Sequence, residues 1–146
     1  MNNLDKNNSF TKLYGIQLEK ITILELFIRS NQIPNEDEKP EATEINLLSG
    51  YSEYDVESKR INIAIKIEIG LEKDSNSPFS MRVELVGEFC VDEEKFPIKH
   101  IEHWAKNNAP YILHPYLREQ VYALTSRIGF DPLILPLVET PVLTIK

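Results

Sequence analysis

The sequence has one cysteine, few glycines and no long apolar run. Cys90 has no second cysteine to pair with in the chain, so an intramolecular disulfide is impossible and a reducing cytoplasm is the simpler expectation. The five glycines leave little of the backbone freedom that phosphate-cradling loops use. No stretch of about 18 apolar residues occurs, so no membrane span is expected. Residues 1–12 are polar and Asn-rich, which predicts a disordered lead rather than an export signal.

Positive charge is also scarce. Sixteen Lys and Arg residues stand against 23 Asp and Glu, which gives a net charge of −7. Such a surface repels phosphate backbones and anionic lipid on average. Nucleic acid and membranes are therefore not expected as partners.

Residue groups that carry catalysis are missing as well. His100 and His103 could begin a metal site, but His114 lies beyond a predicted helix break and no cysteine or carboxylate cluster has zinc spacing. Cys90 lies in an apolar stretch without a positive charge to activate it, so a buried, inert thiol is expected. Neither a nucleophile elbow nor a dinucleotide fingerprint occurs. The sequence predicts no enzyme activity, no metal and no cofactor.

Isoleucine at every second position from 61 to 69 is the clearest local pattern. Polar or small residues lie between them, which predicts a strand with one buried face. The turn at residues 72–78 should join it antiparallel to a strand over 79–91, in which Gly87 marks a bulge or a close approach.

Two more strands are expected upstream. The apolar positions over residues 16–28 change parity, which indicates a bulge or burial on both faces. Ile45 and Leu47 open a strand that weakens at Ser49. The connector over residues 30–44 is acidic and holds two prolines, so it is either a solvated loop or a docking face for a basic partner.

After residue 92 the apolar period changes from two to about 3.6. We expect a short helix over 97–106 and a long one over 110–128 that Gly129 ends and Pro115 bends. Further prolines after residue 131 forbid a long final helix. Strands followed by helices predict one α+β domain over 1–146, a four-stranded antiparallel sheet with a long helix packed on one face.

The run APYILHPYLRE over residues 109–119, followed by Ser126-Arg127, Phe130 and the apolar run over 133–138, strongly resembles the SecB family of bacterial export chaperones. Proline inside a helix followed by Tyr and Arg-Glu is a rare combination. Weaker similarity extends upstream from Tyr14 through residues 20–25 and the isoleucine strand.

The resemblance implies an ATP-independent holdase that binds unfolded polypeptides in an apolar groove, supports protein export and assembles as a homotetramer, a dimer of dimers. The matching groove positions are Thr43, Ile45, Leu47, Leu133, Leu135, Leu137, Leu143 and Ile145. The matching interface positions on the long helix are Tyr116, Arg118, Glu119 and Tyr122. Packing of a loop against the sheet would use the same leucines, so groove and core remain alternatives for them.

The sequence also departs from that family. Its members hand clients to the motor SecA through acidic residues on the sheet and a C-terminal tail. Glu25 is kept as a possible SecA contact, but Arg82 and Ile21 replace two of the acids, and the final helix is reduced to residues 139–146. A second hypothesis is therefore a SecB-like chaperone, dimer or tetramer, dedicated to one partner such as the antitoxin of a toxin–antitoxin system.

Overall fold

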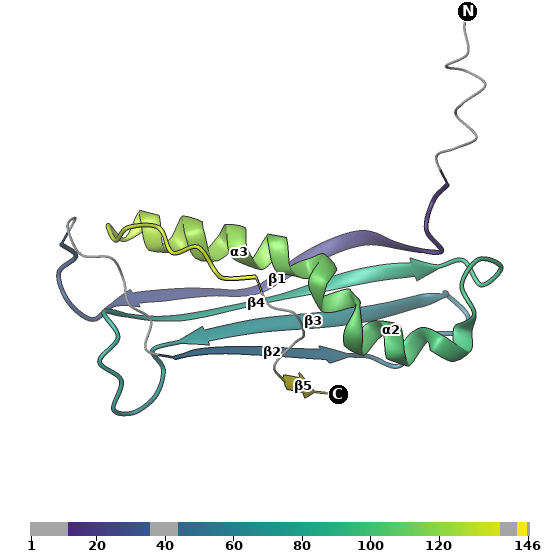
Figure 1. Ribbon diagram of the computed structural model, residues 1–146, viewed down its shortest axis with the longest axis horizontal. Coiled ribbons are helices and arrows are strands. Elements are labelled where there is room, and N and C mark those ends of the chain that lie inside the picture. The colour runs from purple at the N-terminus through teal and green to yellow at the C-terminus, as the bar shows by residue number, and fades with distance from the viewer. Residues whose placement is uncertain (1–11, 36–43, 138–142, 146) are drawn as a thin grey trace, which may run out of the picture.

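The computed structural model describes residues 12–35, 44–137 and 143–145. Four strands form an antiparallel sheet, and the helices lie along one side of it (Figure 1). The expected α+β architecture is therefore confirmed. The predicted disordered lead, apart from Lys12, and most of the acidic connector lie outside the described residues. The strands are β1 (Ile16–Ser30), β2 (Ile45–Tyr51), β3 (Arg60–Ile69), β4 (Phe79–Val91) and the short β5 (Leu143–Ile145), in the spatial order β1-β4-β3-β2-β5.

The isoleucines of β3 form the centre of the core. All five are at most 2% exposed, while the residues between them are exposed or half-buried. Their partners in β4, such as Leu85 opposite Ile65, alternate in the same way. The period-two prediction is thus confirmed, and one sheet face is buried while the other is open.

β1 contains the irregularities that its change of parity predicted. Its pairing with β4 shifts register between Leu18 and Lys20 and again between Ile23 and Glu25. Each shift adds an unpaired residue, which moves the following side chains to the other face. Two bulges, rather than burial on both faces, explain the pattern.

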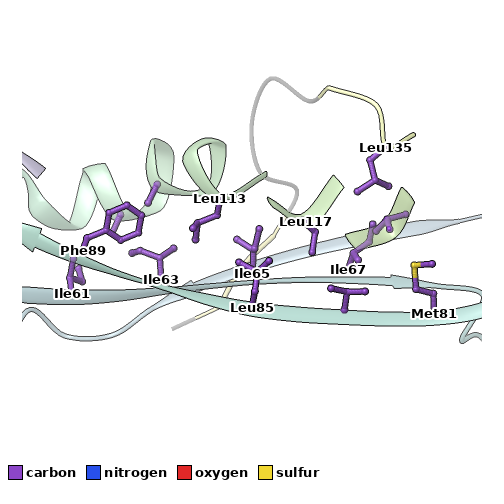
Figure 2. Close-up of a cluster of buried hydrophobic side chains, with 14 of the residues drawn as sticks. Ile61, Ile63, Ile65, Ile67, Met81, Leu85, Phe89, Leu113, Leu117 and Leu135 are labelled. Atoms are coloured by element: carbon purple, nitrogen blue, oxygen red, sulfur yellow. The ribbon is translucent and has the colours of Figure 1, made fainter. Parts of the chain in front are cut away.

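The helices are a 3-10 turn, η2 (Ile98–His100), α2 (Ile101–Asn107) and α3 (Ala109–Arg127). Both predicted helices are confirmed to within about one residue at each end. α3 contains Pro115 and buries the apolar stripe against β3 (Figure 2), where Leu113 and Leu117 point toward the isoleucines. The chain after α3 turns at Gly129, whose φ of 94° suits glycine.

Gly87 is a close approach and not a bulge. It pairs in register with Ile21 on one side and Ile63 on the other. A Cβ placed there would lie 2.6 Å from Leu113 Cδ2, so a larger residue would require the Leu113 side chain of α3 to move.

Three details differ from the sequence-based expectations. Cys90 is half-buried on the open face of β4 and not buried, because its neighbours Phe89 and Val91 take the core positions of the alternation. β2 does not weaken at Ser49 but continues to Tyr51. A fifth strand, β5, pairs parallel with β2 at the edge of the sheet.

Candidate functional site

A narrow cleft lies between β2 and the first turns of α3. Its volume is about 20 Å³, room for roughly one water molecule, so a larger group enters only if side chains move. The lining is mostly apolar and consists of Leu47, Leu48, Ser49, Ile65, Pro110, Tyr111 and His114.

His114 is a buried ionisable residue of this cleft. It is 8% exposed, and its Nε2 lies 3.3 Å from the carbonyl oxygen of Pro136. Burial lowers the pKa of the imidazole; the Pro136 carbonyl opposes this, and the charge of Arg118 adds to the lowering. The imidazole is therefore neutral at pH 7, with Nε2–H donating to Pro136.

The segment after α3 runs back along that helix. The backbone N–H of Leu133 donates to Thr125 Oγ1 at 2.9 Å near the end of α3, and Pro136 meets His114 near its beginning. Leu137, the residue after Pro136, has 80% of its surface exposed. The segment thus contacts the cleft residue His114 through the Pro136 carbonyl.

The proposed groove residues have different environments. Ile45, Leu47 and Leu133 are half-buried, and Leu137 is exposed. Leu135 is 2% exposed and belongs to the core cluster (Figure 2), so a client reaches it only if its segment moves. The backbones of Leu143 and Ile145 pair with β2, whereas Thr43 lies outside the described residues. The groove assignment as a set stays a prediction.

Sequence reasoning did not select Pro110, Tyr111 or His114 for this site. They lie at the start of α3, facing β2 across the cleft. Periodicity places Pro110 on the buried side but does not say which strand it meets. The one available signal was a histidine inside an otherwise apolar run.

A second hollow, of about 490 Å³, lies over β2, β3 and β4. Gly50 and Ala64 supply two small residues there, since they pair with each other, and Ala64 pairs in turn with Val86. A row of charges with Lys66 opposite Glu84 borders it. This hollow is wider and more polar than the cleft.

Arg82 and Glu25 form an ion pair on the open face of the sheet. Arg82 Nε and Nη2 donate to the two carboxylate oxygens at 2.5 and 2.9 Å, and the guanidinium lies 5.4 Å from the ring centre of Phe27. The hydrogen bond from Arg82 lowers the pKa of Glu25 and outweighs its desolvation. The acid that remains at the possible SecA contact is therefore already paired.

The interface residues predicted on α3 lie on its outer side. Tyr116 and Tyr122 are 41% and 48% exposed, Glu119 is exposed and Arg118 is half-buried. These placements leave the assembly prediction open.

The three histidines do not form a cluster. His100 and His103 are exposed, and His103 Nδ1 lies 3.2 Å from the side-chain nitrogen of Asn107. Within the described residues, no three His, Cys, Asp or Glu side chains are arranged to hold a metal ion. Nor is any helix of these ranges long and apolar enough to cross a membrane.

A family model described as "Preprotein translocase subunit SecB" matches residues 13–143. The chain belongs to the SecB family. A protein-export protein SecB from Anaplasma phagocytophilum is 30% identical to this SecB-family chain over 78 residues, 53% of the chain. The matched region spans 49%, about half, of that relative's length.

The fold of the SecB-family chain is also found in a solved structure. The Mycobacterium tuberculosis Rv1957 SecB-like chaperone, in complex with a ChAD peptide from the Rv1956 HigA1 antitoxin, superposes with a TM-score of 0.70 at 16% identity. The match covers 84% of this chain and 90% of that one. At this identity the likeness establishes the shared fold.

Proposed function

We propose that this SecB-family protein is a cytoplasmic, ATP-independent holdase that binds unfolded or partly folded polypeptides. The observation that carries the proposal is the apolar region where the cleft meets the segment after α3. There Tyr111, which lines the cleft with the buried His114, is 37% exposed, and Leu137, which follows the Pro136 contact to His114, is 80% exposed. Burying one exposed leucine contributes about 1.5–3 kcal/mol before ordering costs, whatever the client sequence. Family membership supports the same function.

Aggregation assays test this proposal. The wild-type protein at equal molar ratio should delay aggregation of two unrelated proteins unfolded by heat. Leu137→Asp should lose most of this effect, because an ionised carboxylate at the cleft repels apolar segments. Val56→Asp is the matched control, since Val56 is 71% exposed in the β2–β3 connection and should tolerate the change. A wild-type protein that delays the aggregation of neither client would contradict the proposal.

The Arg82–Glu25 pair favours a second candidate, a chaperone dedicated to one partner such as an antitoxin, without SecA coupling. A salt bridge that neutralises the retained acid removes the charge that a basic docking partner would meet. The antitoxin peptide in the Mycobacterium tuberculosis complex shows that one protein of this fold binds such a partner.

Binding of purified SecA separates the two candidates. We expect no measurable binding by the wild-type protein and a gain of binding by Arg82→Glu, which frees Glu25 and adds a second acid. Arg60→Glu is the control: it breaks the comparable Arg60–Glu19 pair away from the possible contact and should gain nothing. Tight binding of SecA by the wild-type protein would rule out the dedicated candidate.

A further inference from the structure

The segment after α3 inserts a single side chain into the core. We call residues 130–137 of this segment the strap. Leu135 is 2% exposed and belongs to the core cluster, whereas its neighbours Ile134 and Pro136 are exposed. Figure 2 shows Leu135 pointing from the strap toward the sheet, on the side of Ile67. A buried leucine between exposed neighbours fills a site in the core that the rest of the strap does not enter.

Three hydrogen bonds hold the strap, and all of them go to α3. The Phe130 N–H donates to the Thr125 carbonyl at 3.1 Å, and the Leu133 N–H donates to Thr125 Oγ1 at 2.9 Å. The Pro136 carbonyl lies 3.3 Å from His114 Nε2. Within the described residues, the strap makes no hydrogen bond to the sheet.

The ends of the strap are fixed differently from its middle. At its start, Phe130 is 5% exposed, and its ring packs on that of Phe79 with 5.5 Å between the ring centres. Beyond its end, β5 pairs with β2. The middle is held by the side chain of Leu135 and by the bonds of Leu133 and Pro136. It can therefore move away from α3 while both ends stay in place.

Opening the middle of the strap leaves no buried polar group unpaired. Thr125 Oγ1 keeps its bond to the Val121 carbonyl at 2.9 Å, and water replaces the partner of the Leu133 N–H. His114 Nε2 faces the space that the strap leaves, where water reaches it. The main cost is the exposure of Leu135, which favours the closed strap by about tenfold to a hundredfold. Global unfolding opposes a far larger equilibrium constant, roughly 10³–10⁸.

We propose that Leu135 is an internal plug: the strap opens to empty the site of Leu135, and an aliphatic side chain of a bound polypeptide takes its place. The site already holds a leucine, so it fits a side chain of this size and chemistry. The inference rests on the proposed holdase function and adds its regulation. Leu135 then competes with clients and does not contact them, and apparent affinity equals intrinsic affinity scaled by the fraction of molecules with an open strap.

Amide hydrogen exchange of the wild-type protein, followed by NMR, tests whether the strap opens on its own. We expect the Leu133 N–H to be protected about tenfold to several hundredfold, with little dependence on urea, because opening exposes little surface. The Ile65 N–H lies in β3, between β2 and β4, and should exchange only through global unfolding. Equal protection and equal urea dependence of the two amides would overturn the inference.

Binding of an unfolded probe tests the competition. The probe is fluorescently labelled lactalbumin, reduced and carboxymethylated so that it stays unfolded. Leu135→Ala shortens the plug and should tighten probe binding by about threefold to tenfold relative to the wild type. A residue that contacts the client would give weaker binding when truncated, so the sign of the change separates the two roles. Weaker or unchanged binding by this variant means that Leu135 is no plug.

Thr125→Val loosens the strap without changing Leu135. Valine has nearly the shape of threonine but accepts no hydrogen bond, so the closed strap leaves the Leu133 N–H unpaired. We expect probe binding to tighten by about threefold to tenfold and the protection of the Leu133 N–H to fall by a similar factor. Ser126→Val is the matched control, since Ser126 is exposed at the next position of α3. It should leave both quantities within about twofold of the wild type.

These outcomes separate the inference from the proposed function. Wild-type protein that binds the probe, without tighter binding by either variant, overturns the plug and leaves the holdase function standing. Wild-type protein that does not bind the probe overturns both. Circular dichroism checks that each variant is folded, and Thr125→Val decides if Leu135→Ala fails to fold.

Discussion

His114 combines burial with a polar link between two segments. Its folded-state pKa lies below the ordinary value of 6.5 because of desolvation, so at mildly acidic pH the unfolded chain binds more protons at this site. The stability contribution is complete above about pH 6.5 and is lost as pH falls toward the folded-state pKa. We predict that the melting temperature decreases between pH 7.5 and 5.0, measured by circular dichroism.

Two variants test whether His114 causes this pH dependence. His114→Phe keeps an aromatic ring in the cleft but cannot titrate, so it should flatten the decrease in melting temperature. His100→Gln removes an exposed histidine and should leave the wild-type slope unchanged. An unchanged slope in His114→Phe would show that the carboxylates, and not this histidine, set the acid sensitivity.

Gly87 allows one substitution to probe the contact between helix and sheet. The Cβ of Gly87→Ala would lie 2.6 Å from Leu113 Cδ2 and 3.1 Å from Leu18 Cδ1, so side chains or backbone must move. We predict a loss of about 1–3 kcal/mol in the free energy of unfolding, measured with urea.

The double mutant with Leu113→Ala supplies the check. Removing the Leu113 methyl groups creates the space that the new Cβ needs. The double mutant should therefore lose less free energy of unfolding than the sum of the losses in the two single mutants. Strict additivity would mean that the strain at residue 87 arises elsewhere.

At the scale of elements, local periodicity explains what the sequence could predict. Strand β3 alternates without error and α3 carries an apolar stripe between a starting proline and a closing glycine, so each signal lies within its own segment. The bulges of β1 were visible as a change of parity. The SecB-like order of strands and helices followed from these segments.

The cleft and β5 could not be predicted in the same way. Three residues are too few to show a period, and β5 pairs with a strand about 95 residues earlier. Likewise, the burial of Leu135 depends on where the segment after α3 lies. The Thr125 hydroxyl and His114 hold that segment through contacts to its backbone. Such side-chain contacts to a loop backbone leave no pattern in the sequence.

Packing of α3 onto β3 should dominate the stability of the fold. Leu117 is fully buried beneath the helix, whereas Ile112 on the same helix is 38% exposed. We predict that Leu117→Ala lowers the free energy of unfolding by about 2–5 kcal/mol and Ile112→Ala by about 1 kcal/mol or less, measured by urea denaturation. Equal losses would mean that the outer side of α3 is also covered, for example by a second copy of the chain.

At the scale of the whole molecule, the outer side of α3 and the edge strand β1 both expose large apolar or aromatic side chains. The outer side of α3 exposes Tyr116 and Tyr122, and the edge strand β1 exposes Ile23 and Leu26. Apolar and aromatic side chains gathered on one side of a fold are typical of an interface between copies, so a second copy that covers them accounts for their exposure.

We therefore predict that the protein is an oligomer of two or four 16.9 kDa chains, to be measured by light scattering coupled to size exclusion. Tyr116→Glu with Tyr122→Glu should lower the mass, because each change removes aromatic contact area and places a carboxylate in the interface. Val56→Glu, on a remote connection, should not. Since these tyrosines lie outside the core, the double variant should stay folded by circular dichroism. A wild-type mass of one chain would contradict the prediction.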